Sequence, residues 1–276
     1  MLVDRITSAL TLPTDELQST SVQELLVEFL AALNRGEIRS ASPDSTGNWN
    51  VNSWVKQGIL LCFRAGMMTD VSHGGFPFFD KHTIGLRPME LADGIRIVPG
   101  GTAIRTGCYV ARGVICMPPS YVNIGSYIDE GTMVDSHALV GTCAQIGKRV
   151  HLSAAAQIGG VLEPAGARPV IIEDDVMVGG NCGVYEGVIV RSRAVLGSGV
   201  ILNASTAVYD LVNEKILRSQ TDSPLEIPRN AVVIPGARAI NSEFGKAHGL
   251  SVATPLIVKY RDEKTDARTA LEDALR

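Results

Sequence analysis

The sequence lacks the long apolar segments that membrane insertion and export require. No run of 18 apolar residues occurs anywhere in the 276 residues, whereas a membrane-spanning helix needs about 20. The first 18 residues, MLVDRITSALTLPTDELQ, contain no basic segment followed by an apolar core, so they do not resemble an export signal. We therefore expect a cytoplasmic protein.

Excess positive charge and paired cysteines are also missing. The formal net charge is −4, which argues against binding to nucleic acid or to an anionic membrane surface through basic segments. The five cysteines are odd in number and form no Cys-x-x-Cys motif. We interpret them as small core residues in a reducing compartment.

A six-residue repeat dominates residues 104–158. Every sixth residue is apolar, and four positions after each stands a small or β-branched residue. The apolar positions are Ile104, Val110, Cys116, Val122, Ile128, Val134, Val140, Ile146, Leu152 and Ile158. A helix has a period of 3.6 and a half-buried strand a period of two, so this pattern predicts a parallel β-helix, a β-solenoid. Three hexads make one coil, and residues 18 apart should stack.

The repeat continues on both sides of this stretch, with two interruptions. Its frame extends back to Val98 and resumes in a shifted phase from Ile172 to Val208. About eight residues, 164–171, are extra to the coil, and we expect them to project as a loop of the kind that carries binding surfaces in solenoids. A second excursion at residues 209–226 precedes two more hexads, IPRNAV and VIPGAR.

Residues 1–96 show no such period and predict a mainly helical N-terminal domain. A capping box from Ser21 to Glu24 precedes an amphipathic segment that Gly36 can end, which predicts one helix. Residues 54–64, WVKQGILLCFR, predict a second and largely buried helix.

The repeat assigns the remaining chain to two regions. Residues 97–240 form the β-helix, and residues 241–276 predict a strand followed by a short helix capped by Thr265 or Asp266. These end elements would cover the open edge of the last coil.

A β-helix of hexads has a thin core of stacked aliphatic side chains, which leaves little interior room for a ligand. Binding sites must therefore form outside it, in grooves between copies of the chain, which predicts a cyclic homo-oligomer. An ice-binding surface would need regular threonine arrays on one face, and none is present. A non-catalytic scaffold stays open as an alternative.

Several segments carry a resemblance to one family. They are WNVNSWVKQGILLCFR at 49–64, FFDK at 78–81, IRIVPGG at 95–101, MPPSYVNIGSYIDEGTMVDSHALVGTCAQIGKRVHLS at 117–153, IGGVLEP at 158–164 and LIVKYRDEKT at 256–265. The chain resembles the tetrahydrodipicolinate N-succinyltransferases. The resemblance implies a left-handed β-helix, a homotrimer and active sites between subunits.

The same resemblance implies a reaction. Succinyl would pass from succinyl-CoA, a co-substrate, to the amino group of ring-opened tetrahydrodipicolinate, L-2-amino-6-oxopimelate, in the succinylase branch of diaminopimelate and lysine biosynthesis. Neither a metal nor a tightly bound cofactor is implied. Two alternatives remain: an N-acetyltransferase that uses acetyl-CoA, and a zinc carbonic anhydrase of the γ type, for which only His137 and His151 fall inside the repeat.

Two carboxylates are candidates for the catalytic acid/base role, since the attacking amine arrives as an ammonium and must lose a proton. Asp135 follows the inward Val134 and should face outward at a coil corner; the matching aspartate of the family contacts the substrate near its amino group. Glu186 is the second candidate, with partial burial expected beside Tyr185. Several family members carry another glutamate at the position of Gly183, which leaves the division of the role between Asp135 and Glu186 open.

Further residues are candidates for binding. Arg96 matches the family's substrate-binding arginine, since guanidinium groups hold carboxylates in bidentate fashion, and Ser153 should stack one coil after Asp135 and offer a hydroxyl to the substrate. Arg168 lies in the projecting loop, where an arginine suits either a binding role or a solvated surface position. His137, two residues after Asp135, suits a lining role.

Coenzyme A needs cations for its phosphates and backbone groups for its pantetheine amides. Three cations near the C-terminus, Lys246, Lys259 and Arg261, are the candidate phosphate partners. A lysine on a terminal strand is more often merely solvated, and that alternative remains for these residues.

Overall fold

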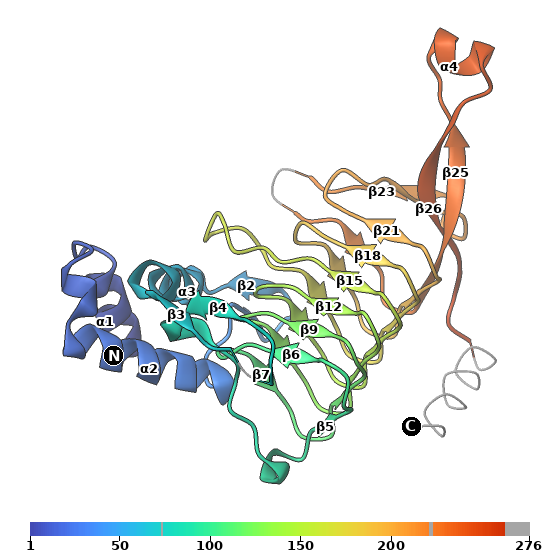
Figure 1. The fold of residues 1–276 in the computed structure, drawn as a ribbon. Coiled ribbons are helices and arrows are strands. Elements are labelled where there is room, and N and C mark those ends of the chain that lie inside the picture. The colour runs from blue at the N-terminus through green and yellow to red at the C-terminus, as the bar shows by residue number, and fades with distance from the viewer. Residues whose placement is uncertain (73, 221–222, 263–276) are drawn as a thin grey trace.

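The computed structural model describes residues 1–72, 74–220 and 223–262. A small helical domain lies beside the first coils of a long solenoid, and a hairpin projects beyond the last coils (Figure 1). The hairpin begins within the region predicted as β-helix, since its first strand is Ala231–Ala239. The predicted C-terminal helix, at 265–276, falls outside the described residues.

The N-terminal domain packs three α-helices around its own apolar core. Its elements are α1 Leu2–Ala9, η1 Glu16–Gln18, α2 Thr20–Asn34, β1 Ala41–Pro43, β2 Trp49–Val51, α3 Ser53–Ala65, β3 Met68–Asp70, β4 Phe79–Lys81, η2 His82–Ile84 and η3 Leu91–Asp93. Phe29 of α2 is wholly buried and meets Trp54 of α3 edge to face, with ring centroids 6.2 Å apart. The helix predicted at 54–64 is confirmed as α3, whereas α1 had no counterpart in the sequence prediction.

The capping box predicted at Ser21 is wrong. Helix α2 begins at Thr20, and its N-cap is Ser19, whose backbone is extended at φ −61° and ψ 145°. Ser21 and Glu24 therefore lie inside the first turns, where their backbone groups are already helical. The earlier start is explained by packing, because Val22 and Leu25 of these turns are buried in the domain core.

The solenoid consists of three parallel sheets, one on each face. The first face contains β5 Arg96–Ile97, β8 Ile115–Cys116, β11 Met133–Val134, β14 His151–Leu152, β17 Met177–Val178 and β20 Val195–Leu196. The second face contains β6 Ala103–Ile104, β9 Tyr121–Val122, β12 Leu139–Val140, β15 Gln157–Ile158, β18 Gly183–Val184 and β21 Ile201–Leu202. The third face contains β7 Tyr109–Val110, β10 Tyr127–Ile128, β13 Gln145–Ile146, β16 Ile171–Ile172, β19 Ile189–Val190 and β24 Glu226–Ile227. This is the left-handed parallel β-helix that the hexads and the resemblance predicted.

Each two-residue strand turns its second residue inward. Val134 stacks on Cys116 and Leu152, 18 residues away on either side, and all three are wholly buried. The cysteines are buried as expected and none is in a disulfide. Because every coil repeats this arrangement, the interior is a continuous apolar column.

The predicted frame differs from the structure in the first coil and again after the IPRNAV hexad. In the first coil Ile97, not Val98, pairs with Cys116, and Gly100 and Gly101 accommodate the additional residue at φ 140° and 96°, angles that favour glycine. At the other end the IPRNAV hexad is confirmed, since Ile227 stacks on Val190.

The last predicted hexad, VIPGAR, is wrong as a coil. Its first residue, Val233, still stacks on Leu196, but the chain then continues straight as β25 Ala231–Ala239 and pairs antiparallel with β26 Ser251–Tyr260. The resulting hairpin carries the short helix α4 Glu243–Ala247 at its tip (Figure 1). The strand predicted near the C-terminus is β26.

The two interruptions are where the sequence placed them. Ile158 and Ile172 are inward residues of consecutive strands, 14 positions apart where the repeat has six, so eight residues are extra. We call residues 159–170 the insertion loop. The second excursion contains the antiparallel pair β22 Val208–Asp210 and β23 Lys215–Leu217.

The third face is covered by the N-terminal domain. The guanidinium carbon of Arg39 lies 3.5 Å from the Tyr127 ring centroid, and Trp49 Nε1 donates to Glu173 Oε1 at 3.0 Å. Burial alone would raise the pKa of Glu173, but hydrogen bonds from Trp49, Arg191 and the Ser192 amide together lower it. On the second face the same domain contacts the first coils, where Phe78, Phe79 and Tyr121 line a common cavity. The corners of Asp135 and Glu186 lie on later coils.

None of the described helices is both long and apolar enough to cross a membrane. Among the same residues no group of three or more His, Cys, Asp and Glu side chains is placed to hold a metal ion.

The packing of the apolar column predicts that shortening any one of its buried side chains destabilises the folded protein. Leu152→Ala should lower the free energy of unfolding by about 2–5 kcal/mol, because a wholly buried side chain loses its contacts and leaves a cavity. Leu91→Ala is the control, since Leu91 is 98% exposed. Denaturant unfolding followed by circular dichroism measures both, and equal midpoints for the two variants would contradict the buried column.

Candidate functional site

Asp135 lies at the corner between the first and second faces. Its amide donates to the Leu152 carbonyl of the next coil at 2.9 Å, and its Oδ1 accepts a bond from the Ser136 amide at 2.7 Å. Ser153 occupies the same corner one coil later, as the 18-residue spacing predicted. The corner therefore presents a carboxylate and a hydroxyl side by side.

His151 is a neighbour of Asp135 that sequence reasoning did not assign to the site. It points outward from β14, and its Nε2 lies 3.8 Å from Asp135 Oδ2, with exposed side-chain fractions of 18% and 30%. The signal was available, since His151 precedes an inward leucine and lies 16 residues after Asp135. His137 lies in the same corner as Asp135 with φ 62° and donates its amide to the Pro119 carbonyl.

Arg96 shares the first face with this pair. Its strand β5 pairs with β8, which pairs with β11, so Arg96 and Met133 stand in one outward column two coils apart. That spacing is about 10 Å along the solenoid axis. The exposed Arg96 side chain therefore lies on the Asp135 side of the molecule.

Glu186 lies at the opposite edge of the second face, between β18 and β19. Its backbone is in the left-handed region, with φ 53°, and its Oε2 accepts a bond from the Ala204 amide at 3.0 Å. The side chain is exposed, so the expected partial burial beside Tyr185 is wrong for a single chain. The left-handed turn points the residue away from the core.

Glu186 borders a cavity of about 860 Å³ that we call the loop cavity. Its walls come from the corners around Glu186, from the insertion loop and from the segments on either side of residues 221–222. The lining includes Gly159, Gly160, Glu163, Arg168, Tyr185, Glu186, Gln220 and Ser223. Arg168 is partly buried here and lines the cavity; its role, which the sequence left open, stays untested.

Tyr185 covers Gly183, the position that left the division of the acid/base role open in the sequence. A Cβ atom at Gly183 would meet the Tyr185 ring, with the hydroxyl oxygen 2.7 Å away, and a Cβ at Gly159 would meet the same ring. The ring therefore lies flat across two glycine positions of the second face. No longer side chain fits at Gly183 while Tyr185 stays in place.

One chain does not bring Asp135 and Glu186 together. Ser153 and Gly179 follow Asp135 in its corner column, and Gly179 belongs to the coil of Glu186. The two carboxylates are thus two coils apart and at opposite edges of the second face. A single subunit cannot place both on one reacting amine.

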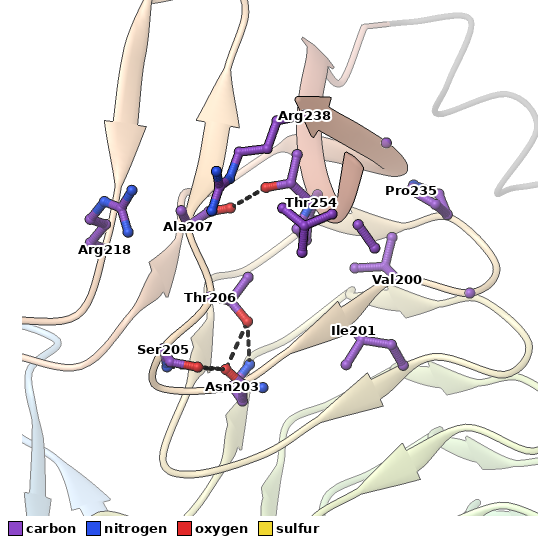
Figure 2. Close-up of a pocket in the computed structure, with 15 residues that line it drawn as sticks. Val200, Ile201, Asn203, Ser205, Thr206, Ala207, Arg218, Pro235, Arg238 and Thr254 are labelled. Atoms are coloured by element: carbon purple, nitrogen blue, oxygen red, sulfur yellow. Dashed lines mark hydrogen bonds between the residues drawn. The ribbon is translucent and has the colours of Figure 1, made fainter. Parts of the chain in front are cut away.

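A second cavity of about 470 Å³ lies where the solenoid meets the hairpin (Figure 2). Arg218 follows β23 and Arg238 comes from β25, and both line this cavity. Thr254 of β26 donates to the Ala207 carbonyl at 2.8 Å on its wall. Asn203 Oδ1 accepts bonds from the hydroxyls of Ser205 and Thr206 on its floor. We call it the arginine cavity.

The three cations predicted for coenzyme A are not gathered in one place. Lys246 is in α4 at the tip of the hairpin, whereas Lys259 pairs with Val232 at its base, about 25 Å away along the strand. Arg261 Nη1 donates to the Asp175 and Arg193 carbonyls at 3.2 and 3.3 Å. Their role in binding stays a prediction, and the arginine cavity was missed because its two arginines lie in segments expected to be a loop and a coil.

Comparisons with known proteins agree with this architecture. The family described as "Tetrahydrodipicolinate N-succinyltransferase N-terminal" matches residues 5–65, and "Hexapeptide repeat of succinyl-transferase" matches residues 169–204. A 2,3,4,5-tetrahydropyridine-2,6-dicarboxylate N-succinyltransferase of Rhodopseudomonas palustris is 42% identical over 92% of this chain and 90% of its own. Enzymes of the same name from Albidiferax ferrireducens and Azoarcus are each 44% identical, over 92% and 93% of this chain and 90% of theirs.

The chain belongs to the tetrahydrodipicolinate N-succinyltransferase family. The resemblance drawn from the sequence segments is thereby confirmed, and with it the class of CoA-dependent acyltransferases. Membership in the N-succinyltransferase family explains both the helical domain and the solenoid, because the matches extend through both.

The thiols of this N-succinyltransferase family member are unsuited to hold an acyl group. Burial raises the pKa of Cys62, Cys108, Cys116 and Cys143 to about 12, and it also raises the pKa of Cys182. Since only the thiolate is a nucleophile, these residues are inert at neutral pH.

A thiol titration tests this directly. The folded protein at pH 8 should show no fast reaction with a disulfide reagent such as Ellman's reagent. In guanidinium chloride the unfolded protein should release five equivalents of thionitrobenzoate per chain, one for each cysteine. Rapid labelling of a stoichiometric thiol in the folded protein would disprove the burial.

Proposed function

We propose that the protein transfers succinyl from succinyl-CoA to the amino group of L-2-amino-6-oxopimelate, the ring-opened form of tetrahydrodipicolinate, in the cytoplasm. The observation that carries the proposal is the likeness to enzymes named for this reaction across more than nine-tenths of the chain. The outward carboxylates of the solenoid supply the chemistry that such a reaction needs.

The reaction is a direct attack within a ternary complex. The neutral amine attacks the thioester carbonyl, a nitrogen–carbon bond forms, and the carbon–sulfur bond breaks as coenzyme A leaves as its thiol. One proton leaves the ammonium before attack and a second leaves the nitrogen afterwards, one of them reaching the departing sulfur. Asp135 and Glu186 take and return these protons. General acid–base catalysis by positioned carboxylates accelerates a reaction by about 10²–10⁴-fold.

The substrate's carboxylates need fixed cations and donors. Arg96 holds one carboxylate from the first face, where its guanidinium is exposed, and the Ser153 hydroxyl donates to the substrate one coil after Asp135. His151 orients the Asp135 carboxylate from a distance of 3.8 Å.

The complete site forms between subunits of a homotrimer. The later coils of the first and second faces present outward side chains, and flat solenoid faces pack against copies of themselves. Asp135 of one subunit then faces Glu186 of its neighbour across a groove, which supplies the proximity that a single chain lacks.

The phosphates of the donor are held in the arginine cavity. Arg218, directly after β23, and Arg238 of β25 both line it, and guanidinium forks match phosphate oxygens. The pantetheine arm extends from there along the second face toward Glu186, with its amides on the outward backbone.

An activity assay tests the proposed reaction. Purified protein with succinyl-CoA and the acceptor analogue 2-aminopimelate should release free thiol, and Asp135→Asn or Glu186→Gln should each lower kcat by about 10²–10⁴-fold. Acetyl-CoA in place of succinyl-CoA tests the N-acetyltransferase alternative. If neither donor is consumed, the proposed function is wrong.

Mixing the two variants tests the site between subunits. A heterotrimer of Asp135→Asn and Glu186→Gln subunits contains one interface at which an intact Asp135 meets an intact Glu186, so co-expression should restore part of the activity. A mixture as inactive as either variant alone would show that both carboxylates serve the same subunit.

The arginine cavity has its own test. The double variant Arg218→Met, Arg238→Met should weaken binding of coenzyme A by about 10-fold at low salt, since both exposed guanidinium groups are lost. Arg229→Met, a change at an exposed arginine outside the cavity lining, is the control. Titration calorimetry measures the affinity, and equal affinities for both variants would place the phosphates elsewhere.

A further inference from the structure

The insertion loop is bonded to helix α3 of the N-terminal domain through a buried lysine. Lys56 of α3 has 0% exposed surface, and its Nζ donates to the Ala167 carbonyl at 2.7 Å and lies 3.5 Å from the Pro164 carbonyl. Desolvation lowers the pKa of this ammonium. Burying a charged group is unfavourable unless it is well bonded. These bonds hold the backbone of the loop at Ala167, the residue directly before Arg168.

The other side of the loop touches the corner that carries Glu186. A Cβ atom at Gly187 would lie 2.8 Å from the Arg168 carbonyl oxygen, and Gly187 has φ 72°. Only glycine permits both the backbone angle and this approach. The loop is thereby clamped between α3 and the Glu186 corner, which gives Arg168 a defined position.

Arg168 enters the loop cavity with an unmet donor. Its Nε is buried and has no hydrogen-bond partner among the described residues, while the residue lines the cavity together with Tyr185 and Glu186. Glu186 directs one carboxylate oxygen to the Ala204 amide of the next coil. A buried guanidinium donor without a partner is costly unless a ligand supplies the acceptor.

We propose that Arg168 binds the free carboxylate of the succinyl group and so makes the protein select a succinyl donor over an acetyl donor. The Nε edge of a guanidinium offers two parallel donors, and a carboxylate accepts both. Lys56 is the positioning residue that holds the loop in place. This inference rests on the proposed function, since it assigns the acyl group of the same donor.

The carboxylate could come from the donor or from the dicarboxylate acceptor, and steady-state kinetics distinguish them. Arg168→Met should lower the ratio of kcat/KM for succinyl-CoA over acetyl-CoA by about 10- to 100-fold, the range for a hydrogen bond to a charged group. Arg168→Lys should retain part of the ratio, because the charge remains but the fork is lost. Arg229→Met is the matched control and should keep the wild-type ratio.

Lys56→Met separates positioning from contact. The variant should lower the same ratio by a smaller factor and should expose the insertion loop to limited proteolysis, whereas Arg168→Met should leave the loop resistant. A thermal unfolding midpoint measured in parallel identifies a variant that has simply failed to fold, in which case the milder Lys56→Arg is used for the same two readouts.

Binding measured without turnover keeps this inference distinct from the proposed function. Titration calorimetry should show that Arg168→Met weakens the binding of succinyl-CoA more than the binding of acetyl-CoA. If the wild type transfers neither acyl group, the proposed function fails, and the calorimetric difference still decides the role of Arg168. The proposal would be overturned by an unchanged donor ratio in both assays, or by an effect of Arg168→Met that is confined to the apparent affinity for the amine acceptor.

Discussion

One inward side chain every six residues is the constraint on which the rest of this molecule depends. Each short strand buries a single aliphatic or small residue, and the next coil buries its equivalent directly above it, as Cys116, Val134 and Leu152 do. The interior is filled by this column from the first coils to the hairpin. The loop cavity and the arginine cavity both lie outside the column, at corners, loops and the hairpin base.

The N-terminal domain then decides which outer surfaces remain accessible. Arg39 stacks on Tyr127 and Trp49 bonds Glu173, so the third face is occupied by the protein's own chain. The candidate carboxylates stand at the two edges of the second face instead. This division is the physical basis of the proposed site between subunits: the chain covers the third face itself and carries functional groups along both edges of the second face.

The positions of residues in the solenoid could be predicted wherever the six-residue repeat is regular. Ser153 stacks beside Asp135 because residues 18 apart must, and the insertion loop was located because it breaks the period. The prediction failed where the chain leaves the rule. Ile97 replaces Val98 because two glycines absorb one residue, and β25 leaves the coil because β26 pairs with it along nine residues. Glu186 was expected to be partly buried, but its left-handed backbone turns it outward.

The sequence by itself determined the repeat, the apolar column and the family, because each depends on a periodic pattern or a local motif that can be read from neighbouring residues. Only the tertiary structure decided which groups share a cavity. Lys56 donates to the Ala167 carbonyl 111 residues away, and Arg218 and Arg238 line one cavity although they come from separate segments. Such contacts depend on how separate segments pack against one another, and no periodicity in the chain encodes that distance.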